Sequence, residues 1–182
     1  MAGRHPRRPR PPLDEDRLNE LMLAYVARFA TSRAKLKAYL ARKVRERGWA
    51  DRGEPPVEAL AAKAVQAGFV DDAAFALGKA RSLTARGYGE RRVAMALHAA
   101  GIGEPDRGAA RDLAQQEAVE AALRFAKRRR FGPFAARAAD PAEREKQLAA
   151  MIRAGHGFTL SKGILTLAPG SEIDRQALQE LN

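Results

Sequence analysis

The chain has 182 residues, enough for one sizeable domain or a short array of repeats, and its 33 Lys and Arg outnumber its 22 Asp and Glu, giving a net charge of +11. It has no cysteine, which excludes disulfides and thiolate metal sites, and its three histidines, His5, His98 and His156, form no metal-binding motif. No apolar run approaches the ~20 residues of a membrane helix, and the first residues lack the apolar core of a signal peptide. We expect a soluble, cytoplasmic protein without a metal or other cofactor.

The positive charge is concentrated in two segments. Residues 1–13 combine four Arg with four Pro and no acid, a composition that predicts a disordered basic arm. Residues 21–50 carry eight Lys and Arg against a single acid, Glu46, and the rest of the chain is neutral overall. Local basic charge is typical of proteins that bind a polyanion or an acidic protein surface. An arginine-rich, alanine-rich proteome would also produce basic chains without such a role.

Beyond residue 13 the chain is rich in the helix formers Ala, Leu, Arg, Glu and Gln, and β-branched runs of strand length are almost absent. Proline and glycine punctuate these stretches, so we predict an all-α protein. The expected helices span residues 14–29, 32–46, 56–67, 71–86, 89–100, 105–113, 117–130, 141–154 and 159–168. Whether 105–113 and 117–130 run together is open. The tail, 169–182, can add a short helix with Ser171 as its N-cap.

Three of these helices share a pattern that indicates an internal repeat. Each carries an apolar pair four residues apart and is followed by Gly and a large apolar residue, a typical helix end. The pairs are Leu36 with Leu40, Val93 with Leu97, and Leu148 with Ile152, and the ends are Gly48-Trp49, Gly101-Ile102 and Gly157-Phe158. Any helical protein shows such features, but their spacing favours three tandem three-helix repeats over residues 14–70, 71–114 and 115–168.

The sequence Gly87-Tyr88-Gly89 has two interpretations. Glycines before a helix can cradle phosphate, but nucleotide-binding loops follow a β-strand and carry further glycines at fixed spacing. Here the preceding segment is predicted to be helical. We therefore favour a joint in which Gly87 ends one helix in a left-handed conformation, Gly89 frees the backbone, and Tyr88 packs between the two helices.

The cationic side chains are the strongest candidates for contact with a partner. Over residues 28–47 one acid accompanies eight bases, so pairing within the helix cannot neutralise the charge. On the predicted outer faces, the candidate contacts are Lys35, Arg42, Arg45, Lys79, Arg86, Arg91 and Arg92. The basic run 127–130 has an alternative explanation, because cations stabilise a helix C-terminus.

Catalytic motifs are missing from the sequence. There is no nucleophile elbow and no Walker loop, and Asp71-Asp72 is placed where one carboxylate would cap a helix and the other would face its positive end. We expect no enzymatic activity and no catalytic residues.

The segments GFVDDAAFA (68–76) and RGYGERRVAMALHAAGI (86–102) together resemble the signature of the RecX family, regulators of the bacterial recombinase RecA. SRAKLKAYLARK (32–43) and EKQLAAMIRAGHGF (145–158) are similar to that family's first and third repeats. In AGHGF the chain carries an additional His-Gly, which leaves the register of the third repeat open. The resemblance covers about residues 20–168.

The resemblance implies an elongated, curved array of three-helix repeats that binds the RecA–DNA filament along its groove and restrains ATP hydrolysis, strand exchange and coprotease activity. It implies no catalytic residues. The chain would act as a non-enzymatic regulator, and we expect it to be a monomer. A rival hypothesis is a helical protein that binds DNA directly, without recombinase, because cationic helices suit phosphate contact. An RNA-associated scaffold is less favoured, since only 6% of residues are aromatic.

Overall fold

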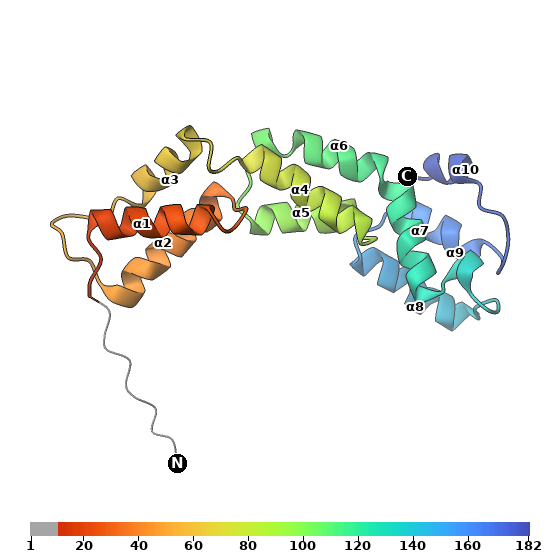
Figure 1. Ribbon diagram of the computed structural model, residues 1–182. Helices are drawn as coiled ribbons and strands as arrows, with labels where there is room; N and C mark the ends of the chain where they lie inside the picture. The colour runs from red at the N-terminus through yellow and green to blue at the C-terminus, as the bar shows by residue number, and fades with distance from the viewer. Residues whose placement is uncertain (1–10) are drawn as a thin grey trace, which may run out of the picture. The chain divides into compact units, whose positions relative to one another are not determined.

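The computed structural model describes residues 11–182 and divides them between two compact units, the first ending at Asp72 and the second spanning Ala73–Asn182 (Figure 1). The regular secondary structure within residues 11–182 is helical, apart from an isolated bridge between Leu13 and Trp49. The predicted all-α class is confirmed. In the same residues, no helix is both long and apolar enough to cross a membrane.

The first unit contains α1 (Glu15–Val26), α2 (Arg33–Arg47) and α3 (Val57–Gln66). Side-chain oxygens start the first two helices: Asp14 accepts from the backbone N–H of Arg17, and Ser32 accepts from that of Lys35. All three helices bury apolar side chains in one cluster, whose fully buried members include Leu18, Met22, Leu36, Leu40 and Ala61. The charged residues of α2 are thereby left on the outer side of the helix.

Most of the predicted basic arm, residues 1–10, lies outside the described residues. The last residue of the predicted arm, Leu13, is part of the folded unit. Leu13 is completely buried in the first cluster, its N–H donates to the carbonyl of Gly48, and its carbonyl accepts from the N–H of Ala50. The burial of the Leu13 side chain holds this segment against the core, and the local composition of residues 1–13 gives no sign of it.

The second unit begins with α4 (Asp72–Ala85), α5 (Glu90–Ala99) and α6 (Gly108–Gln116), with a 3₁₀ turn at Glu104–Asp106. Alanines on α4 and α6 face Val93 and Leu97 of α5, and this second apolar cluster is closed by Ile102. The first residue of α4 belongs to the first unit, where the carboxylate of Asp72 accepts from the backbone N–H of Arg33 at 2.8 Å.

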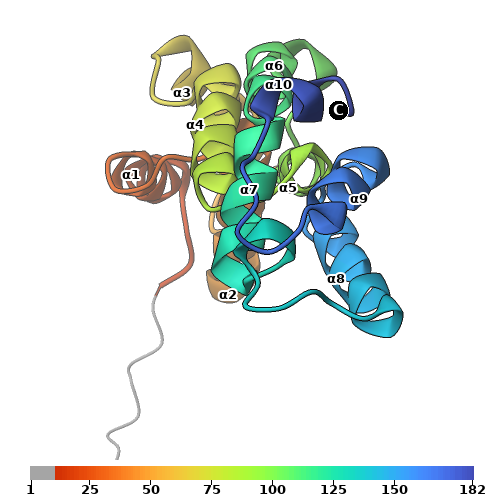
Figure 2. The same cartoon turned by 90° about the vertical axis from the view of Figure 1, so that its right-hand side faces the viewer.

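The second unit continues with α7 (Ala118–Arg129), a 3₁₀ turn at Gly132–Phe134, α8 (Pro141–Arg153), α9 (Phe158–Thr166) and α10 (Arg175–Gln179). Figure 2 shows α8 and α9 side by side, and α7 packs against both. A third apolar cluster, which includes Leu123, Met151, Leu160 and Ile164, joins these helices, and Leu178 of α10 is part of it. The third cluster extends beyond the predicted third repeat, because Leu178 lies outside residues 115–168, and the repeat itself stays a prediction.

Two local predictions are corrected, and one open question is answered. In α8 the fully buried residue is Met151, while Leu148 and Ile152 are only partly buried. The open question about α6 and α7 is answered by a break at Glu117. The N-cap of α10 is Asp174, whose carboxylate accepts from the N–H groups of Gln176 and Ala177, whereas Ser171 lies four residues before the helix. A carboxylate at that position also faces the positive end of the helix.

Candidate functional site

In the joint 87–89, Gly87 has the conformation that the sequence predicts. Gly87 has φ +77°, a left-handed value, and the N–H of Tyr88 donates back to the carbonyl of Leu83, so α4 ends in a Schellman turn. Gly89 differs from the prediction. Its backbone is extended, with φ −83°, so a larger residue could adopt it, and the reason for glycine has to be sought in packing.

A second joint of the same kind packs against the first. Gly155 has φ +95°, the N–H of His156 donates to the carbonyl of Met151, and extended Gly157 starts α9. The left-handed residue after α8 is therefore Gly155 and not the predicted Gly157. The residue that folds back is His156, 2% exposed, whereas Phe158 is 56% exposed. The additional His-Gly of AGHGF makes a Gly-x-Gly joint like residues 87–89.

The two joints interlock through their backbones. The N–H of Gly89 donates to the carbonyl of Ala154 at 3.0 Å, and the N–H of Arg91 donates to the carbonyl of Gly155 at 3.2 Å, so free donors at the start of α5 are satisfied. A Cβ on Gly89 would lie 2.7 Å from the backbone nitrogen of His156, and one on Gly155 would overlap the backbone nitrogen of Arg92. Glycine at both positions permits this close approach.

His156 adds a side-chain hydrogen bond between the two joints. Its Nε2 lies 3.1 Å from the carbonyl oxygen of Gly87, which fixes Nε2–H as the donor. Burial lowers the pKa of His156 to about 4, against a raising effect of that carbonyl, and the Arg128 guanidinium lowers it further. The ring is therefore neutral at physiological pH and acts as a structural donor.

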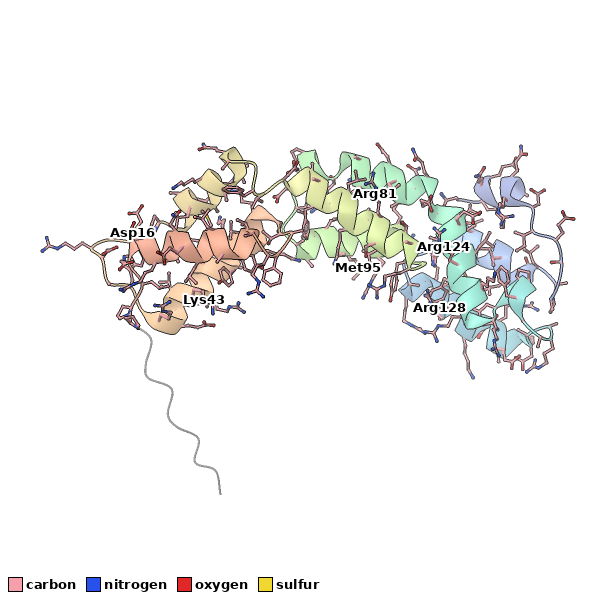
Figure 3. The ribbon with its side chains drawn as sticks, viewed as in Figure 1. Asp16, Lys43, Arg81, Met95, Arg124 and Arg128 are labelled. Carbon is pink, nitrogen blue, oxygen red and sulfur yellow. The ribbon has the colours of Figure 1, made fainter. Side chains whose placement is uncertain are left out.

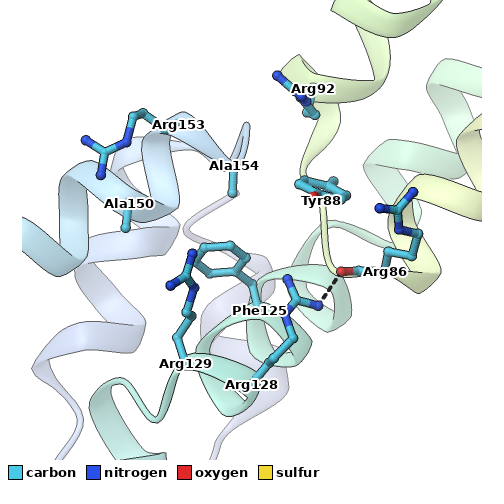
Figure 4. Close-up of a pocket in the computed structure, with 9 residues that line it drawn as sticks. All are labelled: Arg86, Tyr88, Arg92, Phe125, Arg128, Arg129, Ala150, Arg153 and Ala154. Carbon is cyan, nitrogen blue, oxygen red and sulfur yellow. Dashed lines mark hydrogen bonds between the residues drawn. The ribbon is translucent and has the colours of Figure 1, made fainter.

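Above the joints lies a hollow of about 760 Å³. We call it the arginine hollow and define it by its lining residues, Arg86, Tyr88, Arg92, Phe125, Arg128, Arg129, Ala150, Arg153 and Ala154 (Figure 4). The arginines come from the end of α4, the start of α5, the last turn of α7 and the last turn of α8. None of these lining residues is acidic, so the hollow is strongly cationic.

Aromatic rings and the backbone hold these guanidinium groups. Those of Arg86 and Arg92 lie 5.4 and 5.8 Å from the ring centre of Tyr88. In the same way, the guanidinium groups of Arg128 and Arg129 lie 5.4 and 5.7 Å from the ring centre of Phe125. Arg128 also donates to the carbonyl of Arg86 at 2.5 Å (Figure 4). Stacking on a ring orients a guanidinium while its N–H edge stays available to an anion.

Five arginines elsewhere in the second unit are bound to carboxylates. Arg107 and Arg111 share Glu104, Arg124 pairs with Glu117, Arg137 with Glu143 and Arg175 with Glu120, at distances of 2.6 to 2.8 Å. Arg124 and Arg128 lie one turn apart on α7 (Figure 3), yet only Arg124 has an acidic partner among the described residues. The five arginines of the hollow thus have no carboxylate partner among the described residues, a property they share with Arg81 and Arg91 outside it.

The predicted contact residues divide between the two units. In the first, Lys35, Arg42 and Arg45 are exposed on α2. The expectation that α2 lacks compensation is partly wrong, because Glu58 of α3 pairs with both Arg33 and Lys37, and Glu46 lies 3.6 Å from Arg42. Arg45 has no ion pair within residues 11–182. Glu58 comes from a different helix, so counting charge along α2 missed it.

In the second unit, the structure brings Arg86 and Arg92 together at the hollow. Arg91 is exposed on α5 beside it, and Lys79 is half-buried on α4 away from it. The sequence analysis missed Arg128, Arg129 and Arg153. Two of these lie in the basic run 127–130, which the helix dipole seemed to explain, and nothing local indicates Arg153. Within residues 11–182 no group of His, Asp and Glu could hold a metal ion.

No protein-family model matches the sequence. The chain is 34% identical over 177 residues to the regulatory protein RecX of Myxococcus xanthus (strain DK1622), an alignment that covers 91% of this chain and 92% of the relative. Its fold is similar to a crystal structure of RecX from Lactobacillus salivarius, with a TM-score of 0.58 and 15% identity, over 82% of this chain and 92% of that one.

A second crystal structure, of a regulatory protein RecX, matches with a TM-score of 0.56 and 19% identity, over 79% of this chain and 68% of that one. At these identities the two structures support the fold, while the sequence relative, aligned over nearly its whole length, establishes the kinship. The chain therefore belongs to the RecX family of regulatory proteins.

Proposed function

We propose that the chain is a non-enzymatic regulator, mainly an inhibitor, of the RecA recombinase. In this proposal it binds the RecA–DNA filament and modulates ATP hydrolysis, strand exchange and coprotease activity during recombination and the SOS response. It acts as a monomer in the cytoplasm. The observation that carries the proposal is the 34% identity to a protein named regulatory protein RecX, which extends over 92% of that relative.

Charge supports a polyanionic partner. The net charge is +11, and a nucleoprotein filament offers both DNA phosphates and protein carboxylates. Cations stand exposed in both units: Arg45 in the first, and Arg91 with the arginine hollow in the second. We propose Lys35, Arg42, Arg45, Lys79, Arg86, Arg91 and Arg92 as filament contacts. Electrostatic complementarity of this kind speeds association and fixes orientation more than it sets affinity.

The test is the ATPase activity of purified RecA on single-stranded DNA, titrated with the protein. The wild type is expected to slow hydrolysis. A triple variant, Arg42→Glu, Arg45→Glu and Arg91→Glu, is expected to lose inhibition, because three contacts become repulsive towards phosphate or acidic protein. Circular dichroism checks that the variant keeps its helical content.

The matched control changes three other exposed cations, Arg52→Glu, Lys63→Glu and Arg81→Glu, and so alters the net charge by the same amount. It is expected to inhibit like the wild type. Full inhibition by a folded contact variant would refute the proposed contacts. Equal loss in the control would show that overall charge, and not these positions, is responsible.

A second candidate function is direct binding to DNA without recombinase, which the arginine hollow favours because its donors are not occupied by carboxylates. The two functions differ in salt dependence and preference. A filament regulator is expected to bind filament more tightly than bare DNA at equal salt, whereas tight binding to bare duplex, without preference for filament, would favour the second function.

A further inference from the structure

We propose that the arginine hollow is a binding site for consecutive phosphates of a single nucleic-acid strand. The proposal deepens the proposed function by assigning a ligand to one part of the surface, and it rests on that function only for its biological setting. Its physical basis is the arrangement of the five arginines of the hollow, none of which faces an acid among the lining residues.

The first step is availability. Elsewhere in the second unit carboxylates engage Arg107, Arg111, Arg124, Arg137 and Arg175. In the hollow, by contrast, rings and a backbone carbonyl hold four guanidinium groups, and the fifth, that of Arg153, has no hydrogen bond, ion pair or ring partner within residues 11–182. Cations gathered without acids repel one another, and an anionic ligand relieves that repulsion.

The second step is preorganisation. The walls of the hollow are fixed by the interlocked joints, in which Gly89 and Gly155 bring the backbones of α5 and α8 into contact. The ring of Tyr88 is half-buried and that of Phe125 is 5% exposed, so both are anchored where they orient the guanidinium groups. Little side-chain freedom is then lost on binding, which strengthens an ionic site.

The third step is the geometry of the ligand. A planar carboxylate accepts one guanidinium fork, whereas a tetrahedral phosphate has oxygens that accept from several directions. The arginines of the hollow approach from four segments, which suits phosphates better than an acidic peptide. A duplex is stiff and presents its phosphates on a convex surface, so a flexible single strand is the form that can curve into a concave site.

The experiment measures binding of a fluorescent oligothymidylate of about 15 nucleotides to the full chain by anisotropy, without recombinase, over a range of salt. The hollow variant is Arg86→Gln, Arg92→Gln and Arg153→Gln. Its matched control is Arg111→Gln, Arg137→Gln and Arg175→Gln, which removes the same charge from exposed arginines paired with carboxylates. Competitors are inorganic tripolyphosphate, a polyglutamate peptide and a duplex of equal length.

We expect the hollow variant to bind on the order of 100-fold more weakly than the wild type. Three lost phosphate contacts should also lower the salt slope by about 2. The control is expected to stay within about twofold, because its arginines already have partners. Tripolyphosphate is expected to compete at a lower concentration than polyglutamate. If the triple variant does not fold, Arg153→Gln alone, expected to lose roughly tenfold, takes its place.

Three results would overturn the proposal: equal loss in the control, displacement by polyglutamate at a lower concentration than tripolyphosphate, or preference of the hollow for duplex. The assay contains no recombinase, so it separates this site from the proposed function. A chain that binds oligothymidylate through the hollow but leaves RecA ATPase unchanged would keep the site and refute the function. A chain that slows RecA ATPase but does not bind oligothymidylate through the hollow would keep the function and refute the site.

Discussion

The cations of α2 and those of the arginine hollow are held in different ways. On α2, Arg33 and Lys37 share the carboxylate of Glu58, and Arg42 and Lys43 share that of Glu46. In the hollow, rings and a backbone carbonyl hold Arg86, Arg92, Arg128 and Arg129. The more basic stretch of sequence is thus the better neutralised one, and the charge available to a ligand depends on partners in space.

The largest expected effect is a loss of stability at the interlocked joints, which shape the hollow. The cations of α2 do not depend on such joints. Gly155→Ala should destabilise the fold by about 3 kcal/mol or more, because a Cβ there is strained at φ +95° and overlaps the backbone of Arg92. Urea unfolding measures the change. The control is Gly170→Ala, at φ +75° with open space around it, which isolates the conformational cost of about 1 kcal/mol. Equal losses would mean that the close approach contributes nothing.

The second effect is the pH dependence contributed by His156, which lies beneath the hollow. Its pKa is lowered in the folded chain to about 4 from the ordinary 6.5, so the unfolded chain binds the proton more readily between these values. Stability is then full above pH 6.5 and falls as pH drops towards 4, by about 2 kcal/mol at pH 4.5.

Unfolding measured at pH 7 and pH 4.5 tests this pH dependence. His156→Gln keeps an amide donor for the carbonyl of Gly87 but does not titrate, so its loss over the same range should be smaller by that amount. The range avoids lower pH, where Glu143, with a pKa lowered to about 2, and the paired carboxylates Glu58 and Glu104, whose pKa values are also lowered, become protonated. An unchanged pH dependence in the variant would remove His156 from the explanation.

The third effect tests whether the aromatic ring of Tyr88 orients the guanidinium groups of Arg86 and Arg92. Tyr88→Leu keeps all five arginines and much of the apolar volume but removes the ring that Arg86 and Arg92 face. Oligothymidylate binding is expected to weaken roughly tenfold, since two cation–π contacts are lost. Tyr88→Phe retains the ring and should bind like the wild type. Weakening of equal size in both variants would point to the hydroxyl group.

The smallest effect is expected at the acid-paired cations of α2. Glu58 is exposed, and its pKa is lowered by hydrogen bonds from Lys37 and Arg33. Glu58→Gln should lower the urea midpoint only slightly at pH 7, and less again in 0.5 M salt, because exposed ion pairs are weak and screened. The contribution is present above about pH 4.5 and fades as pH falls through the lowered pKa. A loss as large as that of Gly155→Ala would contradict this ranking.

The sequence by itself determined the helical class, the left-handed end of α4 at Gly87, and the family, because propensity, caps and motif spacing are local properties of the chain. The tertiary structure decided what local rules cannot register. It brought Gly155 against Gly89, buried His156 in place of Phe158, and paired α2 with Glu58. It also added Arg128, Arg129 and Arg153 to Arg86 and Arg92, since side chains on different helices share a site only once their helices pack.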